Sequence, residues 1–249
     1  MSPREEGLLQ RARAAGLGPI AEKVLARSRL DLDDGLALYR TSDLYTLGAL
    51  ANHVRERLHR EGYRLKISGE QWLDLARTVH RAGLRSNCTM LHGHIETQEE
   101  KVDHLDRLRR LQDETGGFQT YIPLSFHPAN NEWSHLPGPS ALDELREIAV
   151  GRLMLDNIAH VKAYWIMLSI EVAQLALSFG ADDVDGTVVE EHIYHDAGAK
   201  TPQEVQRVEL VRWITDAGRI PVERDTLYNV IWSADERLAP VGQAAPVGA

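Results

Sequence analysis

The sequence contains a single cysteine, Cys88, among 249 residues. One thiol cannot form an internal disulfide, and it cannot supply the several thiolates of a thiolate zinc site or a cubane iron–sulfur cluster. Cys88 lies in the middle of a predicted strand between Asn87 and Thr89, which favours a small buried residue over a reactive thiol. The cysteine count therefore excludes disulfide-stabilised and thiolate-metal proteins.

Long apolar runs and excess basic charge are also missing. The most apolar run, residues 163–170, is far shorter than the ~18 residues that indicate a membrane span. Lys and Arg number 28 against 37 Asp and Glu, so the net charge is −9, and nucleic acids and anionic lipids bind basic surfaces. The N-terminus has no apolar segment typical of a signal peptide. We expect a cytoplasmic protein that binds neither membranes nor nucleic acid.

The first sixty residues carry helical periodicity throughout. Gly16–Pro19 ends a first helix, and Ser42 or Asp43 is placed to cap a later helix that runs to Leu58. Apolar residues recur every three to four positions in these segments, as they do on the buried face of a helix. We expect residues 1–60 to form an N-terminal helical segment.

Strand and helix patterns alternate from residue 68 onward. Gly116–Gly117 ends a helix and begins a strand, the reverse of the order found in phosphate-binding loops, so it is predicted to be a helix C-cap. Four strand–helix units predict a parallel sheet in an α/β fold, a partial (β/α) TIM-type barrel, because a closed barrel has eight. We place this half-barrel at residues 61–235, before a disordered tail at 236–249. The predicted strands are 84–92, 118–126, 161–168 and 182–189, and the predicted helices are 68–83, 97–114, 140–155, 170–179 and 202–217.

Polar residues gather at the C-terminal ends of these strands, where parallel sheets carry their functional groups. One hypothesis is a metal-dependent hydrolase in which His92 and His94 lie on one side of a strand and His127 and Asp185 complete the site. The lysine or further histidine expected of such a site is not evident. The alternative is that one of the two histidines is a hydrogen-bonded core residue, and no metal is expected.

Four segments together resemble a known family. They are SNCTMLHGHIET, RLQDETGGFQTYIPLSFHPANN, VGRLMLDNIAHVKAYWIML and FGADDVDGTVVEEHIYHDAGA. Over about Ser68 to Tyr228 the chain resembles the C-terminal half of the radical SAM aminofutalosine synthases of the futalosine route to menaquinone. The helices before residue 60 resemble the family's leader. The dehypoxanthine futalosine cyclases and the deazaflavin-cofactor synthases are sister families that share part of the pattern.

The resemblance implies a binding site for S-adenosylmethionine (SAM) and a substrate. The family's fifth-strand motif, which packs near the SAM adenine, is matched by Leu91, Gly93 and Glu96, and the next strand would pass the adenine at Ile122 and Pro123. Position alone suggests a wall around a small substrate, a carboxylate-bearing aromatic enol ether, because imidazole, amide and phenol groups hydrogen-bond carboxylates. No catalytic residue is assigned. The candidates for that wall are His94, His127, Asn130 and Tyr164.

The chain departs from the family in one internal segment. The family binds a 4Fe–4S cluster through a C-x-x-x-C-x-x-C loop in the first half of its barrel, whereas here Val54–His59 runs within a few residues into Tyr63–Gly69. Without three thiolates the chain alone is expected to bind no cluster and to generate no adenosyl radical from SAM. Two hypotheses therefore remain beside the metal hydrolase: an aminofutalosine synthase-like transferase that is inactive alone, and a non-catalytic half-barrel that binds a nucleoside-like ligand or a partner.

A half-barrel exposes an apolar sheet face and two unpaired edges, which must be covered. Either the N-terminal helices fold over that face, or two chains form a homodimer that pairs their half-barrels.

Overall fold

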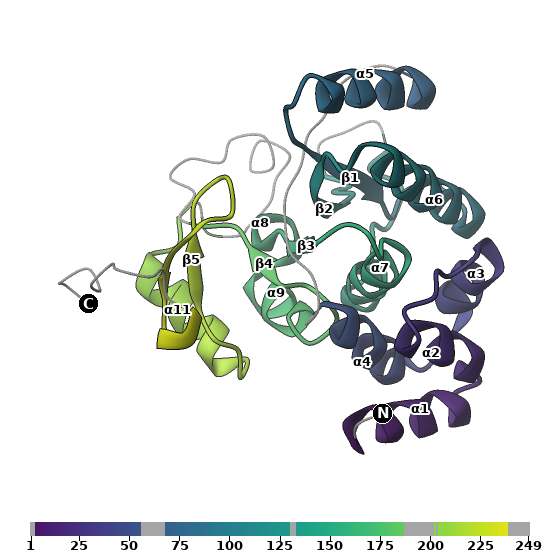
Figure 1. Ribbon diagram of the computed structural model, residues 1–249, viewed down its shortest axis with the longest axis horizontal. Coiled ribbons are helices and arrows are strands. Elements are labelled where there is room, and N and C mark those ends of the chain that lie inside the picture. Colours follow the sequence, from purple (N-terminus) through teal and green to yellow (C-terminus); the bar gives the residue numbers. More distant parts are fainter. Residues whose placement is uncertain (1–2, 56–67, 130–132, 187–201, 203, 239–249) are drawn as a thin grey trace. The chain divides into compact units, whose positions relative to one another are not determined.

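The computed structural model describes residues 3–55, 68–129, 133–186, 202 and 204–238. They divide into two compact units, one that ends at Asp185 and one that comprises Gly186 and the described residues from Pro202 onward (Figure 1). Among the described residues, no helix is long and apolar enough to cross a membrane. Most of the predicted tail, residues 239–249, lies outside the described residues, and the predicted boundary at residue 60 stays a prediction.

The first unit is built on a parallel four-stranded sheet in the order β1-β2-β3-β4. This confirms the predicted α/β class and is compatible with part of a (β/α) barrel. The helices α6 (Gln98–Thr115) and α7 (Ala141–Met154) connect successive strands. The strands are β1 (Ser86–His92), β2 (Phe118–Ser125), β3 (His160–Ala163) and β4 (Asp183–Val184).

Capping explains where the main helices of this unit begin and end. Ser68, Thr97 and Ser140 precede α5 (Gly69–Arg81), α6 and α7, and each hydroxyl accepts a hydrogen bond from the third backbone amide of its helix. In each case the side chain at that third position returns a bond to the cap backbone. Gly116 ends α6 at φ 61°, as predicted for a C-cap.

The two faces of the sheet differ. Tyr121 of β2 is fully buried and lies against α7, where a Cβ on Gly151 would be 2.4 Å from its ring. Cys88 pairs with Tyr121 in register and therefore shares this helix-covered face. Leu91 has the opposite parity, pairs with Leu124, and is 49% exposed. The helix-covered face is thus a packed core. On the other face Leu124 is buried as well, and apolar surface is exposed at Leu91.

The N-terminal segment forms four helices that lie on the helical layer. Within this unit, α4 packs against α7, and α3 contacts both α6 and α7 (Figure 1). The ring of Phe179 packs directly on Gly48 of α4, because a Cβ atom at Gly48 would lie 2.6 Å from that ring. The four helices are α1 (Pro3–Ala14), α2 (Gly18–Leu25), α3 (Leu32–Arg40) and α4 (Leu44–Arg55).

The structure differs from the prediction after Ala163. The third strand ends there, and residues 165–168 form a short helix, α8 (Trp165–Leu168), before Ser169 at φ 75° caps α9 (Ile170–Ala176). A short apolar run fits a buried strand and a buried helix equally well, which is why periodicity alone gave the wrong element.

The second unit contains a helix and a hairpin. Helix α11 (Arg207–Asp216) is shorter than predicted, and the antiparallel strands β5 (Val222–Arg224) and β6 (Val230–Ser233) were not predicted. A 3-10 turn, η1 (Glu236–Leu238), follows. The turn between the strands is closed by Asp225, whose carboxylate accepts hydrogen bonds from the backbone amides of Leu227 and Asn229 at 2.8 Å each. Such Asp and Asn spacing is the signal that could have identified the hairpin.

Candidate functional site

The candidate site lies where β1, β2 and β3 end, because parallel strands bring their C-terminal ends to one edge of the sheet. His94 follows β1, His127 follows β2, and Tyr164 comes directly after β3. The Phe126 amide donates a hydrogen bond of 2.8 Å to the His92 carbonyl, which joins the ends of the first two strands. Asn130, the fourth predicted substrate residue, lies outside the described residues.

The residues predicted to face the adenine fall on both sides of the sheet. Leu91 pairs with Leu124, and Thr89 pairs with Ile122, so Leu91 and Ile122 lie on the same, less covered face. Pro123 pairs with Met90 and has the opposite parity, so its side chain belongs to the helix-covered face. Pro123 can therefore offer only backbone groups, and not its side chain, to the face on which Leu91 lies.

A tight loop follows β1 and is held by Glu96. Its carboxylate accepts hydrogen bonds from the backbone amides of Gly93 at 2.5 Å and His94 at 3.0 Å. Burial raises the pKa of Glu96, but these amide bonds and Lys101 outweigh burial and leave the pKa below its usual value. Gly93 has φ 90°, and a Cβ there would lie 2.6 Å from Pro139, so this position requires glycine.

The His94 ring is fixed on two sides. Its Nδ1 accepts a hydrogen bond of 2.6 Å from the Ile95 backbone amide and lies 2.9 Å from a carboxylate oxygen of Glu96. The ring also meets Phe126 edge-on at a centroid distance of 5.7 Å and Trp133 at 5.5 Å. His94 is therefore oriented by the loop on one side and by an aromatic pair on the other.

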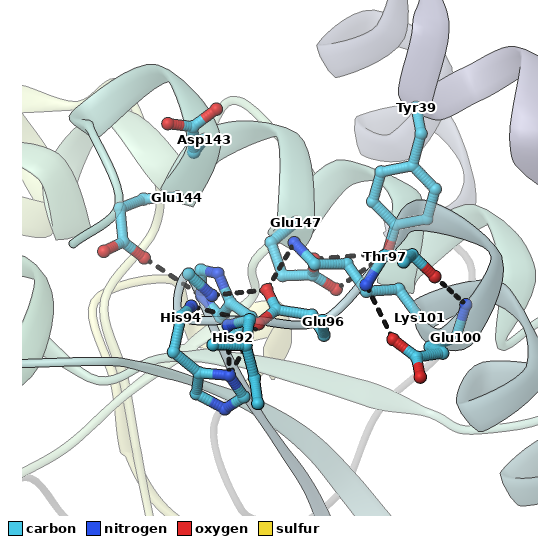
Figure 2. A network of polar contacts seen from close by, with 12 residues as sticks. Tyr39, His92, His94, Glu96, Thr97, Glu100, Lys101, Asp143, Glu144 and Glu147 are labelled. Carbon is cyan, nitrogen blue, oxygen red and sulfur yellow. Dashed lines mark hydrogen bonds and ion pairs between the residues drawn. The ribbon is translucent and has the colours of Figure 1, made fainter. Parts of the chain in front are cut away.

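Behind the loop, a buried polar network leads to the N-terminal segment (Figure 2). Lys101 Nζ lies 3.4 Å from Glu96 Oε1 and donates a hydrogen bond of 3.1 Å to Glu147 Oε2. The hydroxyls of Tyr39 and Tyr121 donate to Glu147 Oε1 at 3.1 and 3.0 Å. Glu147, on α7, thus joins the loop after β1 to α3, α6 and β2.

The pKa values in this network follow from burial and charge. Burial and the neighbouring Glu147 carboxylate raise the pKa of Tyr39 and Tyr121 well above the usual value, so both remain hydrogen-bond donors. Burial lowers the pKa of Lys101, but Glu147 and Glu96 outweigh burial and leave that pKa raised. The network therefore holds a charged lysine between two carboxylates.

His92 and His94 do not form the pair that the metal hypothesis requires. The strand ends at His92, which is fully enclosed with its Nε2 3.2 Å from Glu144 Oε2, while His94 lies beyond the turn at Gly93. Asp185 is bound by Lys162 at 2.7 Å. In the part of the chain that the structure describes, no three His, Cys, Asp or Glu side chains are arranged to hold a metal ion.

His92 is instead a buried core residue whose ring faces the Glu144 carboxylate. Burial lowers its pKa, but the carboxylates of Glu144 and Glu147 outweigh burial and leave the pKa above its usual value. No sequence motif singles out Tyr39, Lys101, Tyr121 or Glu147. Glu144 and Glu147 lie three positions apart on α7, on the helix face that continues into Ile148 and Gly151, and this spacing is the signal that could have revealed them, since buried carboxylates need partners.

Comparison with known proteins gives matches over much of the chain. Residues 115–236 match the family model described as the CofH/MqnC C-terminal region. The aminodeoxyfutalosine synthase of Thermus thermophilus is 52% identical over 188 residues, which are 74% of this chain and 50% of that protein. The aminodeoxyfutalosine synthase of Streptomyces coelicolor is 44% identical over 173 residues, 65% of this chain and 45% of that protein. The cyclic dehypoxanthine futalosine synthase of Streptomyces coelicolor is 36% identical over 215 residues, 86% of this chain and 53% of that protein.

The chain spans about half the length of the curated relatives it matches. The matches confirm the resemblance that the four sequence segments indicated. The chain belongs to the radical SAM aminofutalosine (aminodeoxyfutalosine) synthase family, whose C-terminal region it carries.

Proposed function

We propose that this chain forms the half of an aminofutalosine synthase-type site that binds the adenosyl group of SAM and a carboxylate-bearing aromatic enol ether. The loop from Gly93 to Glu96, closed at the C-terminal end of β1, is the observation that carries this proposal. It brings a backbone turn, an exposed leucine and a fixed histidine to one edge of the sheet. The relatives named aminodeoxyfutalosine synthase support the same assignment.

The residues present fit the adenosyl part of SAM. Leu91 and Ile122 offer apolar surface on one face of the sheet. Leu91, which belongs to the family's fifth-strand motif, is 49% exposed on that face. Purine rings bind to such surfaces through dispersion and loss of apolar contact with water. Bound SAM supplies an adenosyl group; this chain's residues would hold and orient it.

The substrate would lie among the polar groups that follow the three strands. His94, fixed by Glu96 and the aromatic pair, and His127 and Tyr164 at the next two strand ends can donate hydrogen bonds to a substrate carboxylate. Asn130 belongs to the same proposal from the sequence. In the family's reaction the adenosyl group is added to an enolpyruvyl-oxybenzoate, and this chain's contribution would be binding and orientation.

The residues present do not fit a 4Fe–4S cluster. Cys88 is the single cysteine of the sequence, is fully buried, and its Sγ donates a hydrogen bond of 3.3 Å to the Thr120 carbonyl. Burial raises the pKa of this thiol well above its usual value, which disfavours the thiolate that iron requires. We therefore propose that the chain alone does not generate the adenosyl radical.

Titration calorimetry with S-adenosylhomocysteine, a stable adenosyl compound, tests the binding half of the proposal. We expect Leu91→Asp to weaken binding by about tenfold or more, because it places a charge against the adenine. Leu84→Asp is the matched control, since Leu84 is 64% exposed and precedes β1. Equal affinity of the two variants, or no binding by the unmodified chain, would contradict the proposal.

Anaerobic reconstitution with iron and sulfide tests the cluster half. The expected result is no cubane absorption band and no cleavage of SAM. A stable cluster together with SAM cleavage would overturn this part of the proposal and would leave the proposed adenosyl site unaffected.

The homodimer expected from the sequence stays a prediction, and a strict monomer in light scattering at micromolar concentration would contradict it.

A further inference from the structure

A second candidate site lies on the helical side of the first unit, away from the face that carries Leu91. It is a cavity of about 490 Å³ between the end of α3, the first turn of α6 and the first turns of α7. A volume of this size suits a small organic molecule. Three cationic side chains and a single carboxylate line it: Arg40, Lys101, Arg146 and Asp143.

The guanidinium of Arg146 is anchored in a way that leaves one edge available. Its Nη1 donates hydrogen bonds to the carbonyl of Tyr39 at 2.8 Å and to the carbonyl of Thr41. Those two bonds use both hydrogens of Nη1, while Nε–H and Nη2–H form the parallel pair of donors that recognises a carboxylate or phosphate. Among the described residues, Arg146 has no carboxylate partner.

The other charges of the cavity are arranged around this edge. Arg40 pairs with Glu99 at 3.0 Å, but both side chains are about 60% exposed, and such surface pairs contribute little, so a ligand can replace Glu99. Asp143 is occupied by the α7 cap, where its Oδ2 accepts hydrogen bonds from the Ser140 amide at 3.0 Å and hydroxyl at 2.7 Å. Lys101 is held by Glu147 and Glu96. Figure 2 shows Tyr39, Lys101 and Asp143 on three separate elements around this region.

We propose that this cavity binds the oxyanion of a small molecule, a carboxylate or a phosphate, through Nε and Nη2 of Arg146, with Arg40 closing over it. The backbone carbonyls that fix Arg146 belong to the end of α3 and the link to α4, so the ligand would also hold the N-terminal segment against α7. This site is distinct from the proposed adenosyl site, because it lies on the other side of the sheet, and Lys101, which lines it, also contacts Glu96 in the loop of the adenosyl site.

Titration calorimetry with inorganic phosphate and with benzoate, each against chloride at equal ionic strength, tests the proposal. We expect saturable binding of at least one anion, and the stronger of the two identifies the source of the oxyanion. Arg146→Lys keeps the charge and removes the paired donors, and Arg40→Gln removes a charge from an exposed position. Each is expected to weaken binding by about tenfold.

Arg13→Gln is the matched control. Arg13 and Arg40 have the same side-chain exposure, 62%, and each pairs with one glutamate near the surface. Arg40→Gln keeps the proposal testable if Arg146→Lys fails to fold, which circular dichroism shows. Absence of saturable binding for both anions, or an equal loss in Arg13→Gln and Arg40→Gln, would overturn the proposal.

Discussion

The two ends of α7 each carry an enclosed charge cluster, and the two clusters differ in how their charges are satisfied. Near the C-terminal end of the helix, Arg152 lies beside Asp182, and both side chains are fully enclosed. Near the N-terminal end, Glu144 and Glu147 lie beside His92 and Lys101. The first cluster is at the edge of the sheet where the strands begin, and the second is at the edge where they end.

The Arg152 cluster is a closed structural unit. Arg152 Nε donates to the Gly180 carbonyl at 2.8 Å and Nη1 donates to the Ala159 carbonyl at 2.5 Å, while Nη2 pairs with Asp182. Asp182 also contacts His160 and accepts a hydrogen bond of 2.9 Å from the Val161 amide. These bonds connect α7 to β3 and to the start of β4.

The cluster at the other end carries more acid than base. Glu96, Glu144 and Glu147 share two basic partners, Lys101 and His92, and the pKa of each of these two bases is raised. Charge that is not matched one to one costs folding energy and is retained where it orients a functional group. Helix α7 therefore stabilises the sheet with one end and holds the loop of the candidate site, through Lys101, with the other.

Substitution of Arg152 is expected to have the largest effect on the free energy of unfolding. Arg152→Leu leaves the Asp182 carboxylate and two backbone carbonyls without their donor, so the free energy of unfolding should fall by about 3–5 kcal/mol. Urea denaturation measures this change. S-adenosylhomocysteine affinity should stay unchanged where the variant is folded. A loss below about 1 kcal/mol would mean that this cluster is not the structural end of the helix.

A smaller loss of stability is expected for Glu147→Gln, together with a functional change. The substitution keeps the shape but removes the charge that accepts bonds from two tyrosines and Lys101, and hydrogen bonds to charged groups contribute about 1.5–3 kcal/mol. We expect the free energy of unfolding to fall by about 2–3 kcal/mol. We also expect weaker S-adenosylhomocysteine binding, because Glu96 is then the remaining charged partner of Lys101 in this network and its position in the loop changes. Glu99→Gln, at a 60% exposed position, is the control. Unchanged affinity in Glu147→Gln would contradict the positioning role.

The sequence predicted the sheet and the loop better than the network behind them. Local signals sufficed for the helix starts at Ser68, Thr97 and Ser140 and for the helix end at Gly116, because each depends on residues three or four positions apart. The motif of Leu91, Gly93 and Glu96 is recognisable from the sequence for a similar reason, because its residues lie within six positions of one another. The contact of Tyr39 with Glu147, 108 residues away, depends on how α3 packs on α7, and no pattern in either segment specifies that packing.

Tyr39→Phe should separate the network from the rest of the N-terminal segment. Tyr39 is buried and donates one hydrogen bond to the Glu147 carboxylate, so its loss should cost about 1.5 kcal/mol of unfolding free energy, the lower end of the range for bonds to charged groups. Tyr45→Phe is the matched control, since Tyr45 is 89% exposed and should give no measurable change. Equal stability of the two variants would show that α3 is held by apolar packing alone.

The smallest expected effect is on the pH dependence of the free energy of unfolding, to which two buried histidines, His92 and His104, contribute with opposite signs. The raised pKa of His92 means that the folded state binds its proton more tightly, so the stability from His92 is present below about pH 6.5 and is lost as pH rises through the folded pKa. Burial lowers the pKa of His104, so its effect has the opposite sign and weakens the fold as pH falls below about 6.5. Urea denaturation between about pH 5.5 and about pH 8.5 should show the stability advantage of the unmodified chain over His92→Gln shrinking with pH, and its advantage over His104→Gln growing. Slopes of the same sign for both variants would show that the carboxylates beside His92 do not set its charge.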